Sequence, residues 1–138
     1  MTSVPYRIMV ALAARGDERP VIKQAALYAK KFNAHLIAIH VNQPALSQPK
    51  GAVDQKLTKA DIQDRFIKYG FEDILDDIEI IIEYGESISK IINKYAHDID
   101  LIILGHRKQT NFRSRIMDSI DEGISNIAPC PVLVVQKN

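Results

Sequence analysis

The chain has 138 residues, the size of one ordinary domain, and the sequence therefore predicts a single domain over residues 1–138. The formal net charge is +1, which gives no electrostatic reason to expect binding to nucleic acid or to an anionic membrane. The apolar runs are too short to span a bilayer, and the single cysteine permits no intrachain disulfide. We therefore expect a soluble, cytoplasmic protein.

Five short apolar segments alternate with helical patterns along the chain. The predicted strands are Arg7–Ala13, His35–Val41, Ile78–Glu83, Leu101–Leu104 and Val132–Val135. Several of them are unbroken apolar runs instead of alternating ones. Such runs are typical of parallel strands that helices cover on both faces.

Four segments between the strands carry apolar residues at helical spacing: Glu18–Phe32, Leu57–Tyr69, Glu86–Ala96 and Ser119–Ile127. Asp17 is the predicted N-cap of the first helix, and Pro20 lies in the first turn, where proline is tolerated. The alternation of strands and helices predicts an α/β fold with a doubly wound parallel sheet. Ligands bind such sheets beyond the carboxyl ends of the strands, so the loops after Ala13, Val41 and Leu104 are candidate binding loops.

The run from Asp100 to Val135 has a distinctive order of features. An apolar strand ends in Gly105, a polar loop and a short helix follow, and Ala-Pro-Cys-Pro-Val-Leu-Val-Val forms the last strand and its entry. With this order the chain resembles the universal stress protein family over essentially its whole length. The resemblance implies a Rossmann-like sheet of five parallel strands in the order 3-2-1-4-5. It also implies a homodimer in which the last strand pairs with its symmetry mate through Val132, Leu133, Val134 and Val135.

Many members of this family bind ATP through an aspartate at the end of the first strand and a glycine pattern after the fourth. The pattern is Gly, two residues, Gly, nine residues, Gly, then Ser or Thr. The corresponding positions here are Ala13, Gly105, Lys108, Asp118 and Ser119. Ala13, Lys108 and Asp118 therefore differ from the residues that the family pattern requires.

These differences have physical consequences for a nucleotide site. Glycines let the backbone approach phosphates closely, whereas Lys108 adds a side chain at such a position. Asp118 falls at the predicted start of the last helix, where a carboxylate caps the helix and repels a phosphate. Ala13 offers no side-chain hydrogen bond to the adenosine group. The sequence therefore predicts a degenerate nucleotide site and no bound cofactor.

Basic residues favour an alternative in which ATP or AMP still binds. Arg107, Lys108, Arg113 and Arg115 follow the fourth strand, and four cations near its carboxyl end could hold an anion together with backbone groups at Val41 and Gly105. The Gly105-His106 pair, however, resembles the UspA branch of the family, which also lacks the full glycine pattern. This branch favours a stress-response dimer without nucleotide hydrolysis.

Other chemistry finds little support in the sequence. The four histidines show no metal-ligand spacing, and Ser119 is not part of a Gly-x-Ser-x-Gly nucleophile motif. Cys130 is expected to be a small buried side chain. A nucleotide hydrolase or phosphotransferase, the remaining alternative, would need Mg²⁺ ligands and a positioned base near the strand ends. We therefore predict a non-enzymatic stress-response protein that acts as a homodimer and through protein partners.

Overall fold

The structure is a computed structural model that describes residues 5–13, 16–44, 56–107, 124 and 128–137. Five strands form one parallel sheet in the order β3-β2-β1-β4-β5. Their bounds are Arg7–Ala11 for β1, His35–Asn42 for β2, Ile78–Tyr84 for β3, Leu101–Arg107 for β4 and Val132–Lys137 for β5. The predicted α/β class and the strand order implied by the family resemblance are both confirmed.

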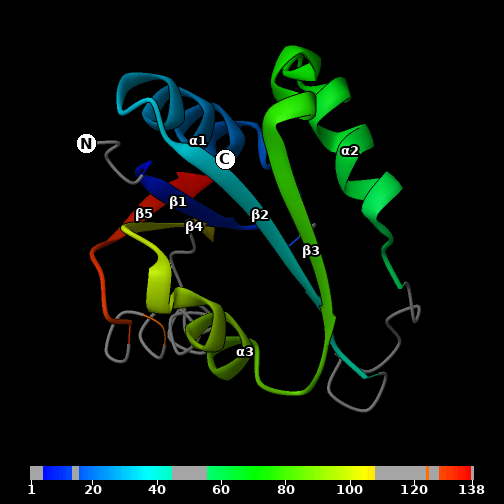
Figure 1. Cartoon of the computed structure of the whole chain (residues 1–138). Coiled ribbons are helices and arrows are strands. Elements are labelled where there is room, and N and C mark those ends of the chain that lie inside the picture. Colours follow the sequence, from blue (N-terminus) through cyan, green and yellow to red (C-terminus); the bar gives the residue numbers. More distant parts are fainter. Residues whose placement is uncertain (1–4, 14–15, 45–55, 108–123, 125–127, 138) are drawn as a thin grey trace.

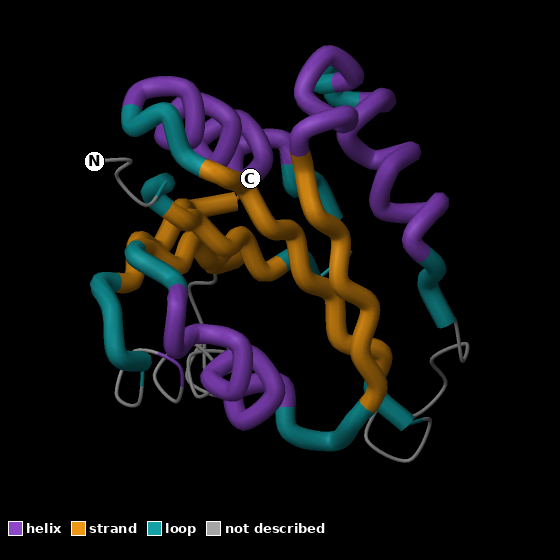
Figure 2. The backbone as a smooth tube through the Cα atoms, in the orientation of Figure 1, coloured by secondary structure: helices purple, strands orange, loops and turns teal. Residues whose placement is uncertain are grey.

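Helices cover both faces of this sheet (Figure 1). Helices α1 (Arg19–Lys31) and α2 (Lys59–Lys68) lie on one face, and α3 (Ile88–Tyr95) lies on the other (Figure 2). Short 3-10 helices, η2 (Glu72–Asp77) and η3 (Ala96–Asp98), lead into β3 and β4. Among the described residues, no helix is long and apolar enough to cross a membrane. Of the predicted helix over residues 119–127, only Ile124 is described, and it is buried against the α3 side of the sheet.

The strands carry unbroken apolar runs because their side chains pack into two core layers, one on each face of the sheet. On β1, Ile8 and Val10 pack toward α1 and α2, whereas Met9 packs toward α3. Neighbouring β4 behaves in the same way, with Ile103 in the first layer and Ile102 in the second. Successive side chains of a strand point to opposite faces, so a sheet buried on both faces needs apolar residues at consecutive positions.

The predicted ends of the strands differ from the structure, by one residue for β2 and β3 and by two or three residues for β1, β4 and β5. Strand β1 ends at Ala11, two residues before the predicted end at Ala13. Strands β4 and β5 run on together to Arg107 and Lys137, because the pairing of Arg107 with Lys137 uses backbone groups and is indifferent to side-chain polarity. The apolar runs of these two strands end at Leu104 and Val135, so a prediction from apolar residues stops there.

The predicted N-cap of α1 is wrong. Glu18, not Asp17, is the N-cap residue, and its side chain makes no capping hydrogen bond. The Glu18 carboxylate is instead almost fully buried and lies 3.6 Å from the Arg65 guanidinium on α2. Asp17 Oδ1 accepts a hydrogen bond from the Arg19 N–H at 3.0 Å, so it bonds to the first turn from one position further out.

Helix α2 begins with a capping box. Thr58 Oγ1 accepts from the Asp61 N–H at 3.3 Å, and Asp61 Oδ2 accepts from the Thr58 N–H at 2.7 Å. The Thr58 backbone N–H, and after it the Thr58 hydroxyl, hold the pKa of Asp61 below its ordinary value. A carboxyl group with a lowered folded pKa stabilises the protein above its unfolded pKa and loses that contribution as the pH falls through the folded pKa.

The Asp61→Asn variant should therefore lose less stability in acid than the native chain. The difference in unfolding midpoint between the two proteins is expected to shrink below about pH 4, the ordinary aspartate range. Thermal unfolding followed at several pH values measures it. Thr58→Ala, which keeps the backbone N–H donor, should reduce the pH dependence without abolishing it. An Asp61→Asn variant with an unchanged acid profile would contradict this assignment.

Candidate functional site

The candidate site lies at the edge of the sheet that is formed by the carboxyl ends of the strands, called here the carboxyl edge. At this edge β1 lies between β2 and β4. Ala11 is aligned with Ile39 on β2 and with Leu104 on β4. Beyond this row the Leu12 N–H still donates to the Ile39 carbonyl at 2.9 Å. The residues that follow in each segment, Ala13, Val41 and Gly105, therefore lie at the same edge of the sheet.

Other predicted site residues are only partly visible. Arg107 lies in the last pair of the β4–β5 ladder, at the same edge. Lys108, Asp118 and Ser119 lie outside the described residues. Ala13 is exposed, and its methyl group can make no hydrogen bond. Ala13 therefore offers only its backbone groups to a ligand at the position where the family pattern has an aspartate.

Gly105 makes close packing possible on the α1 side of the sheet. A Cβ atom at this position would lie 2.7 Å from Val21 Cγ2 on α1 and 2.6 Å from Lys137 Cδ on β5. Lys137 is 9% exposed, and its aliphatic stem packs over the glycine. On this face, the first glycine of the nucleotide pattern serves the packing of α1 and β5.

A Gly105→Ala substitution should destabilise the fold by about 1–3 kcal/mol, the usual cost of overpacking a filled core. The Lys137 stem can move aside, but Val21 on α1 is fully buried and cannot. The double variant Gly105→Ala/Val21→Ala should therefore cost less than the sum of the two single changes. Urea unfolding measures all three variants, and strictly additive costs would contradict the packing role.

A chain of buried hydrogen bonds joins three segments at the same edge. His40 Nδ1 lies 2.7 Å from the Leu12 carbonyl, and His40 Nε2 lies 3.2 Å from Asn42 Oδ1. The Asn42 amide makes two bonds of 2.9 Å with the backbone of Leu57, donating to its carbonyl and accepting from its N–H. His40 is 7% exposed and Asn42 is 4% exposed. Sequence reasoning missed this network, although two polar residues at the end of an apolar strand are a signal for it.

Comparison with known proteins identifies the family. Residues 6–136 match the sequence model of the Universal stress protein family. The chain belongs to this family. A Staphylococcus aureus protein assigned to the universal stress proteins is 27% identical over 137 residues, which cover 94% of this chain and 82% of that protein.

Solved structures of universal stress proteins share the fold. UspA from Lactobacillus plantarum has a TM-score of 0.61 at 21% identity, covering 97% of this chain and 99% of that one. A universal stress protein in complex with cAMP has a TM-score of 0.69 at 18% identity, covering 99% of this chain and 100% of that one. A universal stress protein from Archaeoglobus fulgidus in complex with dAMP has a TM-score of 0.57 at 18% identity, covering 94% and 97%.

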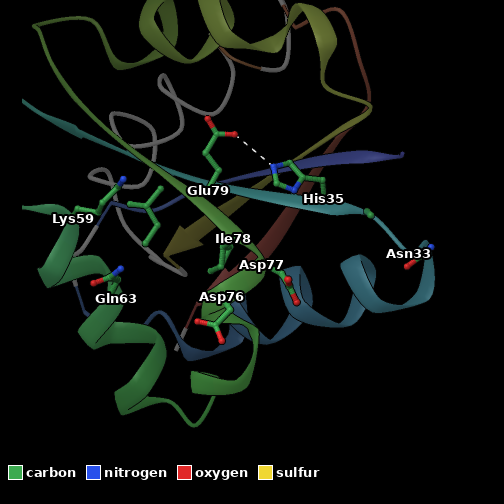
Figure 3. Close-up of a pocket in the computed structure, with 10 residues that line it drawn as sticks. Asn33, His35, Lys59, Gln63, Asp76, Asp77, Ile78 and Glu79 are labelled. Carbon is green, nitrogen blue, oxygen red and sulfur yellow. Dashed lines mark ion pairs between the residues drawn. The ribbon is translucent and has the colours of Figure 1, made fainter. Parts of the chain in front are cut away.

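An open depression of about 790 Å³ in this universal stress protein lies away from the carboxyl edge. It follows the starts of β2 and β3 and the side of α2 (Figure 3). Asp76, Asp77 and Glu79 give it acidic walls, and Glu79 Oε2 lies 3.5 Å from His35 Nε2. Within the residues that the structure describes, no three His, Cys, Asp or Glu side chains are grouped to hold a metal ion.

Cys130 is half-buried and packs against the α3-side core beside Val132. Burial, and then the charge of Asp100, raise the pKa of the Cys130 thiol. The thiolate is the reactive form of cysteine, so this environment disfavours nucleophilic chemistry. The packing role predicted from the sequence agrees with this position, although the side chain is less buried than expected.

Proposed function

We propose that this chain is a non-enzymatic stress-response protein that acts as a homodimer and through protein partners, with a degenerate nucleotide site. The proposal rests on the residues that lie at the carboxyl edge of the sheet. Ala13 supplies only a methyl group there, and Lys137 and Val21 already occupy the α1 side of Gly105.

Phosphoryl transfer needs side chains that Ala13, Val41 and Gly105 do not supply. Such reactions depend on ligands for Mg²⁺, a group that orients the nucleophile, and donors that stabilise the phosphoryl oxygens. In the described part of the edge, Ala13, Val41 and Gly105 contribute backbone groups and apolar side chains. Lys108 and Asp118 further replace two of the glycines that would let a polyphosphate approach the backbone.

The homodimer is supported by the character of β5. This strand pairs with β4 on one side and has no second neighbour among the described strands. Val134 is 44% exposed, although its neighbours along the strand are apolar and half-buried. An apolar edge strand tends to pair with another strand, and a twofold copy of β5 satisfies its free backbone groups without leaving a new edge.

A specific observation favours one alternative, the binding of an adenine mononucleotide. Two universal stress proteins of similar fold are described in complexes with cAMP and with dAMP. A mononucleotide carries a single phosphate, so it depends less than ATP on the missing glycines. Arg107 and the basic residues that follow it in the sequence would then supply the charge that holds the phosphate.

A thermal-shift series with ATP, AMP, cAMP and dAMP distinguishes a degenerate site from one that binds a mononucleotide. A ligand raises the unfolding midpoint only when its concentration well exceeds its Kd. A degenerate site has a Kd above the millimolar range, so the proposal predicts no shift for any of the four nucleotides at millimolar concentration. A shift with AMP or cAMP alone would favour the mononucleotide alternative. Release of inorganic phosphate from ATP would contradict the non-enzymatic assignment.

A further inference from the structure

The buried network at the end of β2 has a feature that concerns proton binding. We refer to His40, Asn42 and the backbone groups of Leu12 and Leu57 as the His40 clasp. The clasp connects the end of β1 to the end of β2, and both to the segment that enters α2. All three segments border the candidate site.

The amide orientation of Asn42 is fixed by two bonds to one residue. Its Nδ2 donates to the Leu57 carbonyl and its Oδ1 accepts from the Leu57 N–H, each at 2.9 Å. A flipped amide would place a donor against the N–H and an acceptor against the carbonyl, and both bonds would be lost. The atom that faces His40 Nε2 is therefore an oxygen.

Both ring nitrogens of His40 thus face acceptors. The Leu12 carbonyl, 2.7 Å from Nδ1, can only accept, and Asn42 Oδ1, 3.2 Å from Nε2, can only accept. A neutral imidazole carries one N–H, whereas the imidazolium carries two. We propose that the closed clasp binds a second proton on His40, and that this proton joins the exit of β1 to the segment entering α2.

Among the residues that the structure describes, no carboxylate is paired with His40. On the same face of the sheet, Glu18 is paired with Arg65 at 3.6 Å, and Lys137 packs beside Gly105. On the neighbouring strand β3, Glu83 accepts a hydrogen bond of 2.8 Å from the Tyr95 hydroxyl on the α3 side. In the described part of the chain, the two acceptors of the His40 ring are therefore the neutral oxygens of Leu12 and Asn42. The second proton is held only while both oxygens stay within hydrogen-bond distance of the ring.

Loss of this proton would open the clasp. The bare Nε2 would turn its lone pair toward Asn42 Oδ1, and two facing acceptors repel each other. Asn42 would then leave Leu57, and the segment entering α2 would lose its anchor to β2. The inference is independent of nucleotide binding, because it concerns the connection between the strands and requires no ligand.

Amide hydrogen exchange of the native chain, followed by NMR at about pH 5 and about pH 8, tests the inference across the range in which histidine charge changes. The Leu57 N–H is the reporter, because it donates to Asn42 Oδ1. We expect its protection factor, which corrects for the intrinsic pH dependence of exchange, to fall about fivefold or more at the higher pH, the effect of losing one hydrogen bond. The ring signals of His40 should show two bound hydrogens at the lower pH.

Two matched variants complete the experiment. His40→Gln can still donate to the Leu12 carbonyl but cannot take up a proton, so the pH dependence at Leu57 should vanish. His35→Gln changes a partly exposed histidine on the same strand, which pairs with Glu79, and it should leave that dependence intact. Equal Leu57 protection at both pH values in the native chain, or a bare His40 Nε2 at about pH 5, would overturn the inference. The ring measurement needs no variant, so it decides the question even if His40→Gln does not fold.

Discussion

The triple variant Ala13→Asp, Lys108→Gly, Asp118→Gly is expected to bind ATP about a hundredfold more tightly than the native chain. The new aspartate supplies the hydrogen-bonding carboxylate that the family pattern places at the end of the first strand, a contact of about 1 kcal/mol. Removing a carboxylate from the predicted helix start relieves phosphate repulsion of similar size. The Lys108→Gly change lets the backbone approach the phosphates, which adds another hydrogen bond of about 1 kcal/mol. Together these terms amount to about 3 kcal/mol, or about a hundredfold in Kd.

A matched variant separates the restored pattern from a simple change of charge. The variant Ala13→Leu, Lys108→Ala, Asp118→Ala removes the same two charged side chains but supplies neither carboxylate nor glycines. Calorimetric titration with ATP and Mg²⁺ should give a much smaller gain for it than for the restored variant. If the restored variant binds ATP no better than the native chain, the three differences are not what disables the site.

The Val134→Lys variant is expected to weaken the proposed homodimer by about a hundredfold or more. In a twofold pairing of β5, this side chain lies near its own copy, so the substitution brings two like charges together and buries them. Val134 is 44% exposed in the single chain, so the substitution should leave the monomer folded. Sedimentation velocity over a concentration series measures the shift toward monomer.

The control for this experiment is Leu27→Lys. Leu27 on α1 is 41% exposed, close to the exposure of Val134, but it does not belong to β5. Its substitution should leave the association unchanged. A native chain that sediments as a monomer at micromolar concentration would rule out the proposed dimer, and an unchanged dimer in Val134→Lys would place the interface elsewhere.

The layered sheet could be predicted from the sequence because its cause is local. Consecutive apolar residues such as Met9 and Val10 point to opposite faces of the sheet, so both are buried only if helices cover both faces. That requirement can be read from the sequence. The strand order, in contrast, came from the family resemblance of the segment around Gly105. Boundaries failed where backbone pairing continues past the last apolar residue, as it does at Arg107 and Lys137.

Polar features of the site were harder to predict, since their partners are remote in sequence. Glu18 is buried because Arg65, on another helix, lies against it. Asn42 reads as the start of a polar loop, yet it is buried because its amide bonds to Leu57 across that loop. Neither partner could be inferred from the residues nearby. The packing of Lys137 over Gly105 likewise depends on the register of β4 and β5.

Titration of the native chain with ATP in the presence of Mg²⁺ by isothermal calorimetry tests the central claim, a degenerate nucleotide site, most directly. The protein should first be purified without added nucleotide and its absorbance spectrum examined for a bound base. We predict no stoichiometric nucleotide in the purified protein and no saturable heat of binding at micromolar ATP. A one-to-one complex with micromolar affinity, or nucleotide that stays bound through purification, would contradict the proposed function.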